Sequence, residues 1–139
     1  GPAMATALNY GLHACTDITG FGILGHLLEM AHGCNARVVL DYSKLLFYAD
    51  ALAMYKKGET TGSNKPNRAM VAKHHLDLQV SLSAAEEELL YDPQTSGGLL
   101  LSLPSHQADE LLTSLAADGV KNAVQVGKIT ADPVGITVA

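Results

Sequence analysis

The chain of 139 residues has no tryptophan and only two phenylalanines, so its hydrophobic side chains are mainly aliphatic. Hydrophobic residues still make up 47% of the sequence, which is enough for the core of one ordinary domain. No apolar run reaches the roughly 18 residues that a membrane-spanning helix requires. The sequence therefore predicts one domain with an aliphatic core and no membrane as partner.

Positive charge is scarce as well. Nine Lys and Arg residues stand against fourteen Asp and Glu residues, which gives a formal net charge of -5. The basic residues form no long run, whereas binding to nucleic acid depends on a basic surface that neutralises phosphate. We therefore expect no nucleic acid as partner.

Cysteine is rare, and its two positions lack the spacing of a metal or redox motif. Cys15 and Cys34 show neither a C-x-x-C pattern nor a histidine at metal-ligand spacing. The favoured interpretation is two reduced, partly buried thiols in a cytoplasmic protein. A disulfide or a redox pair is the alternative.

The first residues, Gly1-Pro2-Ala3-Met4, resemble the remnant of protease cleavage and cloning. We expect residues 1–2, or the first four, to be such a remnant. Residues 3–139 are then expected to form a domain of a longer native protein.

Hydrophobic periodicity predicts both helices and strands. Helical patterns, several of them bounded by a capping residue or a glycine, cover residues 4–9, 21–33, 43–57, 69–73, 84–90 and 105–119. Strand patterns cover residues 10–14, 36–42 and 98–103, and the last residues alternate on both sides of Asp132-Pro133 as in a hairpin. Ser83 with Glu86 has the form of a capping box. The elements predict the α/β (α+β) class, with a single domain in which helices pack on a mixed β-sheet.

Asp17 lies where a strand pattern gives way to a helix pattern, in the stretch T-D-I-T-G-F-G. An Asp or Thr before a helix is typical of an N-cap, and spacing alone favours Asp17 or Thr19 as that cap. The alternative is a ligand for a hard cation, because Mg²⁺ commonly binds one or two carboxylates together with phosphate oxygens. Gly20 and Gly22 would then let the main chain approach a phosphate.

Two other segments have the composition of functional loops. Residues 92–98, D-P-Q-T-S-G-G, are best interpreted as a helix-to-strand turn, with an anion-facing loop of N–H and hydroxyl donors as the alternative. Residues 58–68 lack the G-x-x-x-x-G-K-[ST] order of a P-loop, so they are expected to form a solvated loop, or else a mobile lid.

The histidines carry no evident chemistry in the sequence. His13 and His26 flank the glycine-rich stretch without a nucleophile or metal partner, and we expect His26 on the polar side of its helix. His74 and His75 are adjacent, and both are expected to face solvent.

Two long segments resemble the selenophosphate synthetase (selenide, water dikinase) family. They are HACTDITGFGILGHLLEM at residues 13–30 and LLYDPQTSGGLLLSLP at residues 89–104, with GSNKPNR at a comparable place between them. The resemblance covers nearly the whole chain. It implies the carboxy-terminal α/β domain of the superfamily that includes aminoimidazole ribonucleotide synthetase.

Enzymes of this family make selenophosphate from selenide, ATP and water, and they release AMP and orthophosphate. The resemblance implies Mg²⁺ as cofactor and ATP as substrate. It also implies that Asp17 is one of the Mg²⁺ ligands, which reverses the preference for a cap. Further implied partners are an amino-terminal ATP-binding domain and, in the full-length enzyme, a second copy in a homodimer.

The family's reactive Cys or selenocysteine, its nearby Lys and its other metal-binding aspartates have no match in this chain. Cys15 lies inside the later motif and does not correspond to the reactive residue. The resemblance therefore implies no catalytic residue here and an inactive domain in isolation. The rival interpretations are another enzyme of the superfamily, such as thiamine monophosphate kinase or a hydrogenase maturation factor, and a non-catalytic interaction or scaffold domain.

Overall fold

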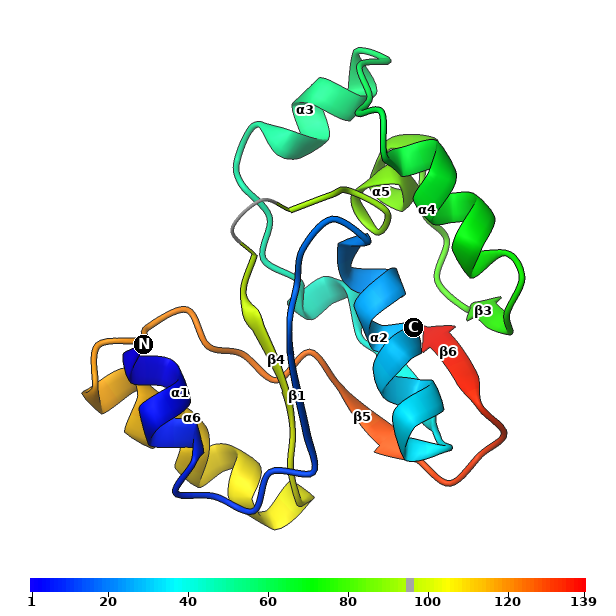
Figure 1. The fold of residues 1–139 in the computed structure, drawn as a ribbon. Coiled ribbons are helices and arrows are strands. Elements are labelled where there is room, and N and C mark those ends of the chain that lie inside the picture. Colours follow the sequence, from blue (N-terminus) through cyan, green and yellow to red (C-terminus); the bar gives the residue numbers. More distant parts are fainter. Residues whose placement is uncertain (95–96) are drawn as a thin grey trace.

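A computed structural model describes residues 1–94 and 97–139 and shows two β-sheets with helices packed on them (Figure 1). A two-stranded antiparallel ribbon consists of β1 (Ala14–Asp17) and β4 (Leu99–Ser102). A four-stranded sheet consists of β2 (Arg37–Leu40), β3 (Leu76–Leu78), β5 (Gly127–Thr130) and β6 (Gly135–Val138). The expected α/β class is confirmed, but the strands form two sheets rather than one.

The four-stranded sheet has the order β3-β6-β2-β5 and mixes parallel with antiparallel pairing. β6 runs parallel to β2 and β3, whereas β5 runs antiparallel to β2. The predicted terminal hairpin is therefore wrong, because β2 lies between β5 and β6. All four residues of β6 are buried, so this strand needs neighbours on both edges, while β5 has exposed residues and lies at the sheet edge.

The main hydrophobic core lies where α2 (Gly22–Cys34) packs on β6, β2 and the ribbon. Its fully buried members are aliphatic, as predicted, and include Leu24, Leu40, Leu90, Ile136 and Val138. α2 continues through Gly33, which was expected to end it. The C-cap is Asn35, whose left-handed backbone (φ 49°) is a conformation that asparagine tolerates.

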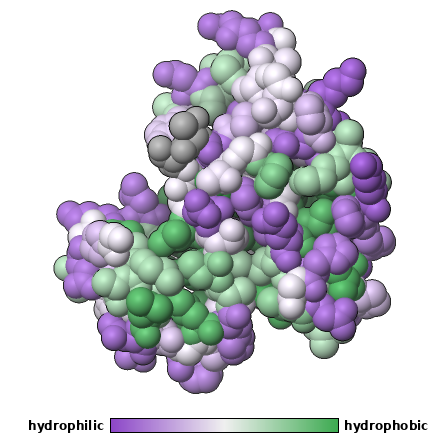
Figure 2. All heavy atoms as spheres, in the orientation of Figure 1, coloured by the Kyte–Doolittle hydropathy of each residue, from purple (hydrophilic) through white to green (hydrophobic). Residues whose placement is uncertain are grey.

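A second, smaller core lies between α1 (Pro2–Ala7) and α6 (Ala108–Ala117). Ala7, Leu111 and Leu115 are buried there, and Leu101 of the ribbon packs against them. In Figure 2, hydrophobic residues gather in the lower part of the view, where α1 meets the ribbon. Ser105, at the start of the helix pattern predicted over 105–119, does not cap α6, because it begins a 3-10 turn, η2 (Ser105–Gln107), that leads into the helix.

Three short helices lie together at the top of Figure 1: α3 (Ala51–Lys56), α4 (Asn64–Val71) and α5 (Ala84–Leu89). The capping box of Ser83 and Glu86 at the start of α5 is confirmed. The helix predicted over 43–57 is only partly right, since a 3-10 turn, η1 (Tyr42–Lys44), and α3 are its helical parts. Leu46, Phe47 and Tyr48 are exposed, so no buried stripe stabilises a helix between them.

The solvated loop predicted over 58–68 is also partly wrong, because α4 begins at Asn64. Pro66 lies in the first turn of α4, where its missing N–H costs no helical hydrogen bond. Asn64, Asn67 and Val71 are buried at a spacing of one helical face, although two of them are polar. Across the described parts of the chain, the helices are too short or too polar to cross a membrane.

The strand order predicts that alanine substitutions at two isoleucines lower the free energy of unfolding by different amounts. Ile136→Ala on β6, where the side chain is 0% exposed, should lower the free energy of unfolding by about 2–5 kcal/mol, measured by urea titration. The control Ile129→Ala on β5, 38% exposed, should cost less than about 1 kcal/mol. Equal losses would contradict a central β6 and an edge β5.

Candidate functional site

Asp17 is the last residue of β1 and pairs with Leu99 of β4. Burial alternates along β1, so Ala14 and Thr16 are half-buried while Cys15 and Asp17 are exposed. The Asp17 carboxylate therefore extends into solvent at the end of the ribbon. No side-chain hydrogen bond or ion pair joins it to any described residue, so it is available to a ligand.

The turn that follows Asp17 is not built as an N-cap. The N-cap residue of α2 is Phe21, without a side-chain cap, so neither Asp17 nor Thr19 fills the predicted role. The reason is that α2 starts against another segment, where Leu90 O accepts a hydrogen bond from Leu24 N at 3.3 Å. Asp17 is thus free of the structural role that spacing alone favoured.

His26 holds this turn against α2, and its predicted place on the polar side of the helix is wrong. The imidazole is 5% exposed, and Nε2 accepts a hydrogen bond from Thr19 N at 2.9 Å. Nδ1 therefore carries the proton and donates to Glu29 Oε2 at 3.2 Å. With partners on both nitrogens, His26 has a supporting role and no free ligand atom.

Main-chain hydrogen bonds dock the turn after Asp17 onto the described residues 90–94 and 97–98. Besides the bond to Leu90, they are Ile18 N to Gly98 O at 2.9 Å and Gln94 N to Thr19 O at 3.0 Å. The two motifs that stood apart in the sequence are thus one structural unit. Residues 95–96, in the middle of the predicted 92–98 turn, lie outside the described residues.

Two glycines permit this close approach. Gly22 has a φ of +70°, and a Cβ added to it would lie 2.9 Å from the carbonyl carbon of Tyr91. A Cβ on Gly97 would overlap the carbonyl oxygen of Ile18. Each motif therefore contributes one glycine at which a side chain would separate the two segments.

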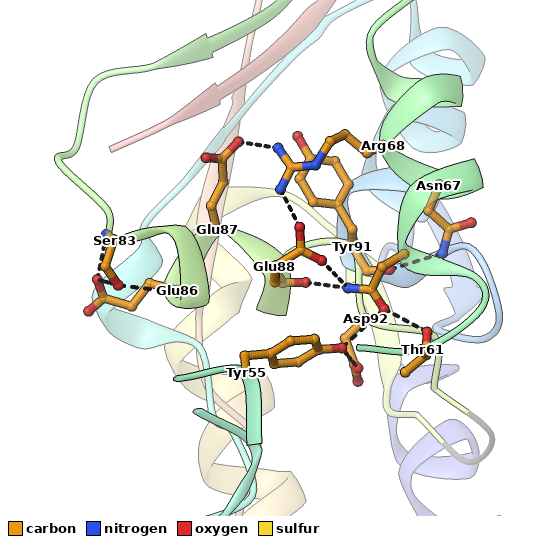
Figure 3. A network of polar contacts seen from close by, with 11 residues as sticks. Tyr55, Thr61, Asn67, Arg68, Ser83, Glu86, Glu87, Glu88, Tyr91 and Asp92 are labelled. Carbon is orange, nitrogen blue, oxygen red and sulfur yellow. Dashed lines mark hydrogen bonds and ion pairs between the residues drawn. The ribbon is translucent and has the colours of Figure 1, made fainter. Parts of the chain in front are cut away.

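Asn67, on the inner side of α4, links both segments to that helix (Figure 3). Its Nδ2 donates to Gly20 O at 2.8 Å and to Tyr91 O at 3.0 Å, and the residue is 5% exposed. One buried amide thus uses both of its hydrogens to join the turn after Asp17 to the start of the 92–98 loop.

Tyr55 anchors Asp92 from the other side, and Asn64 contacts Tyr55 and bonds α5 (Figure 3). The Tyr55 hydroxyl contacts Asp92 Oδ1 and lies 3.1 Å from Asn64 Oδ1. Asn64 Nδ2 donates to Glu88 O at 3.1 Å and to Glu88 Oε2 at 2.7 Å. Burial, followed by the hydrogen bond to Asp92, raises the pKa of Tyr55 above its ordinary 10.0.

Arg68 ties α4 to α5 at the same place. Its guanidinium lies 2.5 Å from Glu87 Oε1 and 2.8 Å from Glu88 Oε1, and 4.3 Å from the centre of the Tyr91 ring (Figure 3). Exposed ion pairs contribute little individually, but this planar group fixes three neighbours at once. The three short helices therefore hold Tyr91 and Asp92, at the start of the 92–98 loop, in place.

Asp17 is not among the described residues that line the two depressions of the surface. Depressions of about 300 and 390 Å³ are lined by other residues, the first by Cys15, Cys34, His13 and Glu29, the second by Tyr55, Lys65 and Arg68 among others. Within residues 1–94 and 97–139, no three His, Cys, Asp or Glu side chains are placed to hold a metal ion. The described residues alone thus provide one carboxylate rather than a complete metal site.

The thiols and the adjacent histidines take no part in the main-chain hydrogen bonds that dock the turn after Asp17. Cys15 and Cys34 are free and exposed, so the expectation of partly buried thiols is wrong, and no disulfide joins them. His74 and His75 are exposed as predicted, and His74 Nδ1 lies 3.1 Å from His32 Nε2.

Sequence reasoning missed the supporting residues, above all Asn64, Asn67 and Tyr55. Two signals were present: a proline three residues into the helix, and an i, i+3, i+7 spacing of Asn64, Asn67 and Val71. The composition of GSNKPNR masked them, because asparagine and glycine are typical of loops.

Comparison with known protein families shows the family to which the chain belongs. A family model described as "AIR synthase related protein, C-terminal domain" matches residues 2–139. The chain therefore belongs to this family, and the resemblance inferred from the two motifs is confirmed at the level of the superfamily.

Within this family, the chain is similar to several curated proteins named selenide, water dikinase. The Paraburkholderia xenovorans protein is 42% identical over 119 residues, which cover 86% of this chain and 33% of that protein. The proteins of Pelobacter propionicus (38%) and Burkholderia ambifaria (37%) match 90% and 99% of this chain, and 36% and 39% of their own length. The chain thus spans 33–39% of the length of these relatives.

Solved structures support the fold. Escherichia coli HypE, a hydrogenase maturation protein, matches 99% of this chain and 35% of its own with a TM-score of 0.62 at 16% identity. Another hydrogenase maturation protein HypE matches 92% of this chain and 34% of its own, with a TM-score of 0.54 at 17% identity. Similarity at this level of identity shows a shared fold alone.

Because the two motifs dock closely, alanine substitutions at two neighbouring glycines should lower the free energy of unfolding by different amounts. Gly22→Ala places a Cβ against Tyr91 at a positive φ and should lower the free energy of unfolding by about 1–3 kcal/mol. Gly20→Ala meets nothing within 4 Å, so its effect should stay within about 1 kcal/mol. Thermal unfolding of both variants measures this, and equal midpoints would contradict the contact.

The raised pKa of Tyr55 predicts that the stability of the fold depends on pH in the alkaline range. Since its folded pKa is raised, the contribution of the neutral phenol is present below about pH 10 and is lost as pH rises through the folded pKa. Asp92→Asn should lower the pKa of Tyr55 while burial keeps it above 10.0, so the loss should still begin near pH 10 but should be smaller and complete at a lower pH. NMR titration of the Tyr55 ring measures the pKa, and an unchanged value would contradict the contact.

Proposed function

We propose that this chain is the carboxy-terminal domain of a selenophosphate synthetase, which converts ATP, selenide and water into selenophosphate, AMP and phosphate. In this proposal Asp17 contributes one ligand to a Mg²⁺ ion that is bound together with ATP. The identity of 37–42% to the three selenide, water dikinases supports the reaction. The observation that carries the site is a solvent-facing carboxylate at a strand end, with main chain fixed on both sides.

The donor chemistry around Asp17 fits one metal contact. Mg²⁺ prefers oxygen ligands, keeps several waters, and is commonly held by one or two carboxylates together with phosphate oxygens. A single exposed carboxylate suits that arrangement, whereas a site made only of protein ligands would require more donors than the described residues place together. Asp17 would therefore hold the ion jointly with ATP phosphates and with ligands from outside this chain.

The contribution of this chain to catalysis is positional. Bound Mg²⁺ supplies neutralisation of the charge on the polyphosphate during phosphoryl transfer. β1–β4 pairing fixes the main chain before Asp17, and the hydrogen bonds of Ile18 and Thr19 fix it afterwards. The carboxylate is thus presented from an ordered backbone, which reduces the entropy lost on binding.

The remaining parts of the enzyme lie outside this chain in the proposal. An amino-terminal ATP-binding domain supplies the other metal ligands and the reactive residues, the full-length enzyme is a homodimer, and the isolated domain is inactive. Residues 92–98 serve as a support for Asp17 or as a neighbour of the substrate, which agrees with the bond between Ile18 N and Gly98 O.

The rival is another ATP-using enzyme of the superfamily. HypE shares the fold at 16–17% identity, which is far below the identity to the selenide, water dikinases and favours the latter. AMP formation by the longer protein, measured with and without selenide, separates the two. A purely scaffolding domain would leave ATP turnover independent of Asp17.

Substitution of Asp17 tests the site. In the longer protein, Asp17→Asn should lower kcat/KM for ATP by at least about 100-fold and raise the Mg²⁺ concentration for half-maximal turnover, because a metal ligand contributes several kcal/mol. The unfolding midpoint should remain near that of the wild type, since the side chain is exposed.

The matched control for this substitution is Asp109→Asn on α6. Asp109 is an exposed carboxylate in the first turn of that helix. It takes no part in the hydrogen bonds that dock the turn after Asp17. It should leave AMP formation and the Mg²⁺ requirement unchanged. Near-normal turnover in the Asp17 variant would reject the assignment.

A further inference from the structure

Asn67 occupies a position from which it can control the geometry of the Asp17 carboxylate without touching any ligand. Gly20, whose carbonyl it binds, lies three residues after Asp17, and Tyr91, whose carbonyl it also binds, directly precedes Asp92. The same amide nitrogen bonds both oxygens, at 2.8 and 3.0 Å. The separation between the two segments is therefore set by one planar group.

The helix that carries Asn67 is anchored without it. Asn64, one turn earlier in α4, bonds α5 through Glu88 and contacts Tyr55 of α3. Arg68 bonds Glu87 and Glu88 and lies over the Tyr91 ring. Removal of the Asn67 amide should thus leave α4 in place while it releases the turn after Asp17 on that side.

We propose that Asn67 is a positioning residue for the binding of a Mg²⁺–nucleoside triphosphate complex at Asp17. It holds the turn after Asp17 and the start of the 92–98 loop at a fixed distance, so that both face the same bound phosphates. This inference rests on the proposed role of Asp17 as a metal ligand. It assigns a function to one buried asparagine of the GSNKPNR segment, which the sequence alone assigned to a loop.

Without the amide, the two carbonyl oxygens lose their shared donor and the turn gains freedom to move away from residues 90–98. The remaining main-chain bonds, including Gln94 N to Thr19 O, keep the turn attached. Asp17 is then present but less well oriented, which weakens metal binding more than it alters the chemical step. Groups that orient a metal ligand typically contribute about 10- to 100-fold to metal affinity.

The experiment measures ATP turnover by the longer protein as a function of Mg²⁺ at saturating ATP. Asn67→Ala should raise the Mg²⁺ concentration for half-maximal turnover roughly 10-fold or more, while turnover at saturating Mg²⁺ recovers to within about 3-fold of the wild type. Asn67→Ser retains a hydroxyl donor that can serve one carbonyl, so its Mg²⁺ requirement should be intermediate. If the alanine variant does not fold, the serine variant provides the test.

Asn64→Ala is the matched control. This variant also removes a buried asparagine amide from α4. Asn64, however, bonds α5 and contacts Tyr55, and it has no bond to the turn after Asp17. Its unfolding midpoint should fall while its Mg²⁺ requirement stays within about 2-fold of the wild type, because no bond to the metal-bearing turn is lost. Comparison of the two variants therefore distinguishes a positioning role of Asn67 from a loss of fold stability alone.

Two results would overturn the inference, and they are distinguishable. Equal Mg²⁺ requirements in the Asn67 and Asn64 variants, with an increase in Asp17→Asn, would show that Asn67 only stabilises the fold while the proposed function survives. A wild-type Mg²⁺ requirement in Asp17→Asn would overturn the proposed function and this inference with it.

Discussion

The main-chain docking of the turn after Asp17 onto residues 90–98 is the interaction on which the site depends. The bonds of Ile18 to Gly98 and of Gln94 to Thr19 join residues 80 and 75 positions apart in sequence, and glycines at 22 and 97 let the two segments approach. Main-chain bonds between fixed segments give little freedom to the residues beside them. An exposed carboxylate at the end of β1 thus rests on an ordered base, which is what a metal ligand requires.

Polar side chains, rather than hydrophobic packing alone, support this base. Tyr55, Asn64 and Asn67 are buried, and each has hydrogen-bond partners on the segments it joins. Among the described residues, no buried side-chain nitrogen or oxygen is left without a partner. A satisfied buried network fixes one arrangement, since a shift of any member leaves a polar atom unpaired at a cost of about 1–3 kcal/mol.

Local patterns in the sequence predicted what local chemistry determines. The capping box of Ser83 and Glu86, the strand β4 and the course of α2 follow from residues close in the chain. The order of the strands does not, because the alternation in β5 and β6 is equally compatible with a hairpin and with β2 between them. The first part of α4, residues 64–68, was mistaken for a loop because its buried face is built from asparagines, whose partners are distant in sequence. The exposure of Asp17 agrees with its expected availability, whereas its support could be found only in three dimensions.

A crystal structure of the longer protein with Mg²⁺ and a non-hydrolysable ATP analogue tests the role of Asp17 most directly. We predict a Mg²⁺ ion about 2.1 Å from an Asp17 carboxylate oxygen, shared with phosphate oxygens of the nucleotide. The bonds of Ile18 to Gly98 and of Gln94 to Thr19 should persist in that complex. Phosphates bound elsewhere, with the Asp17 carboxylate left in solvent, would contradict the account.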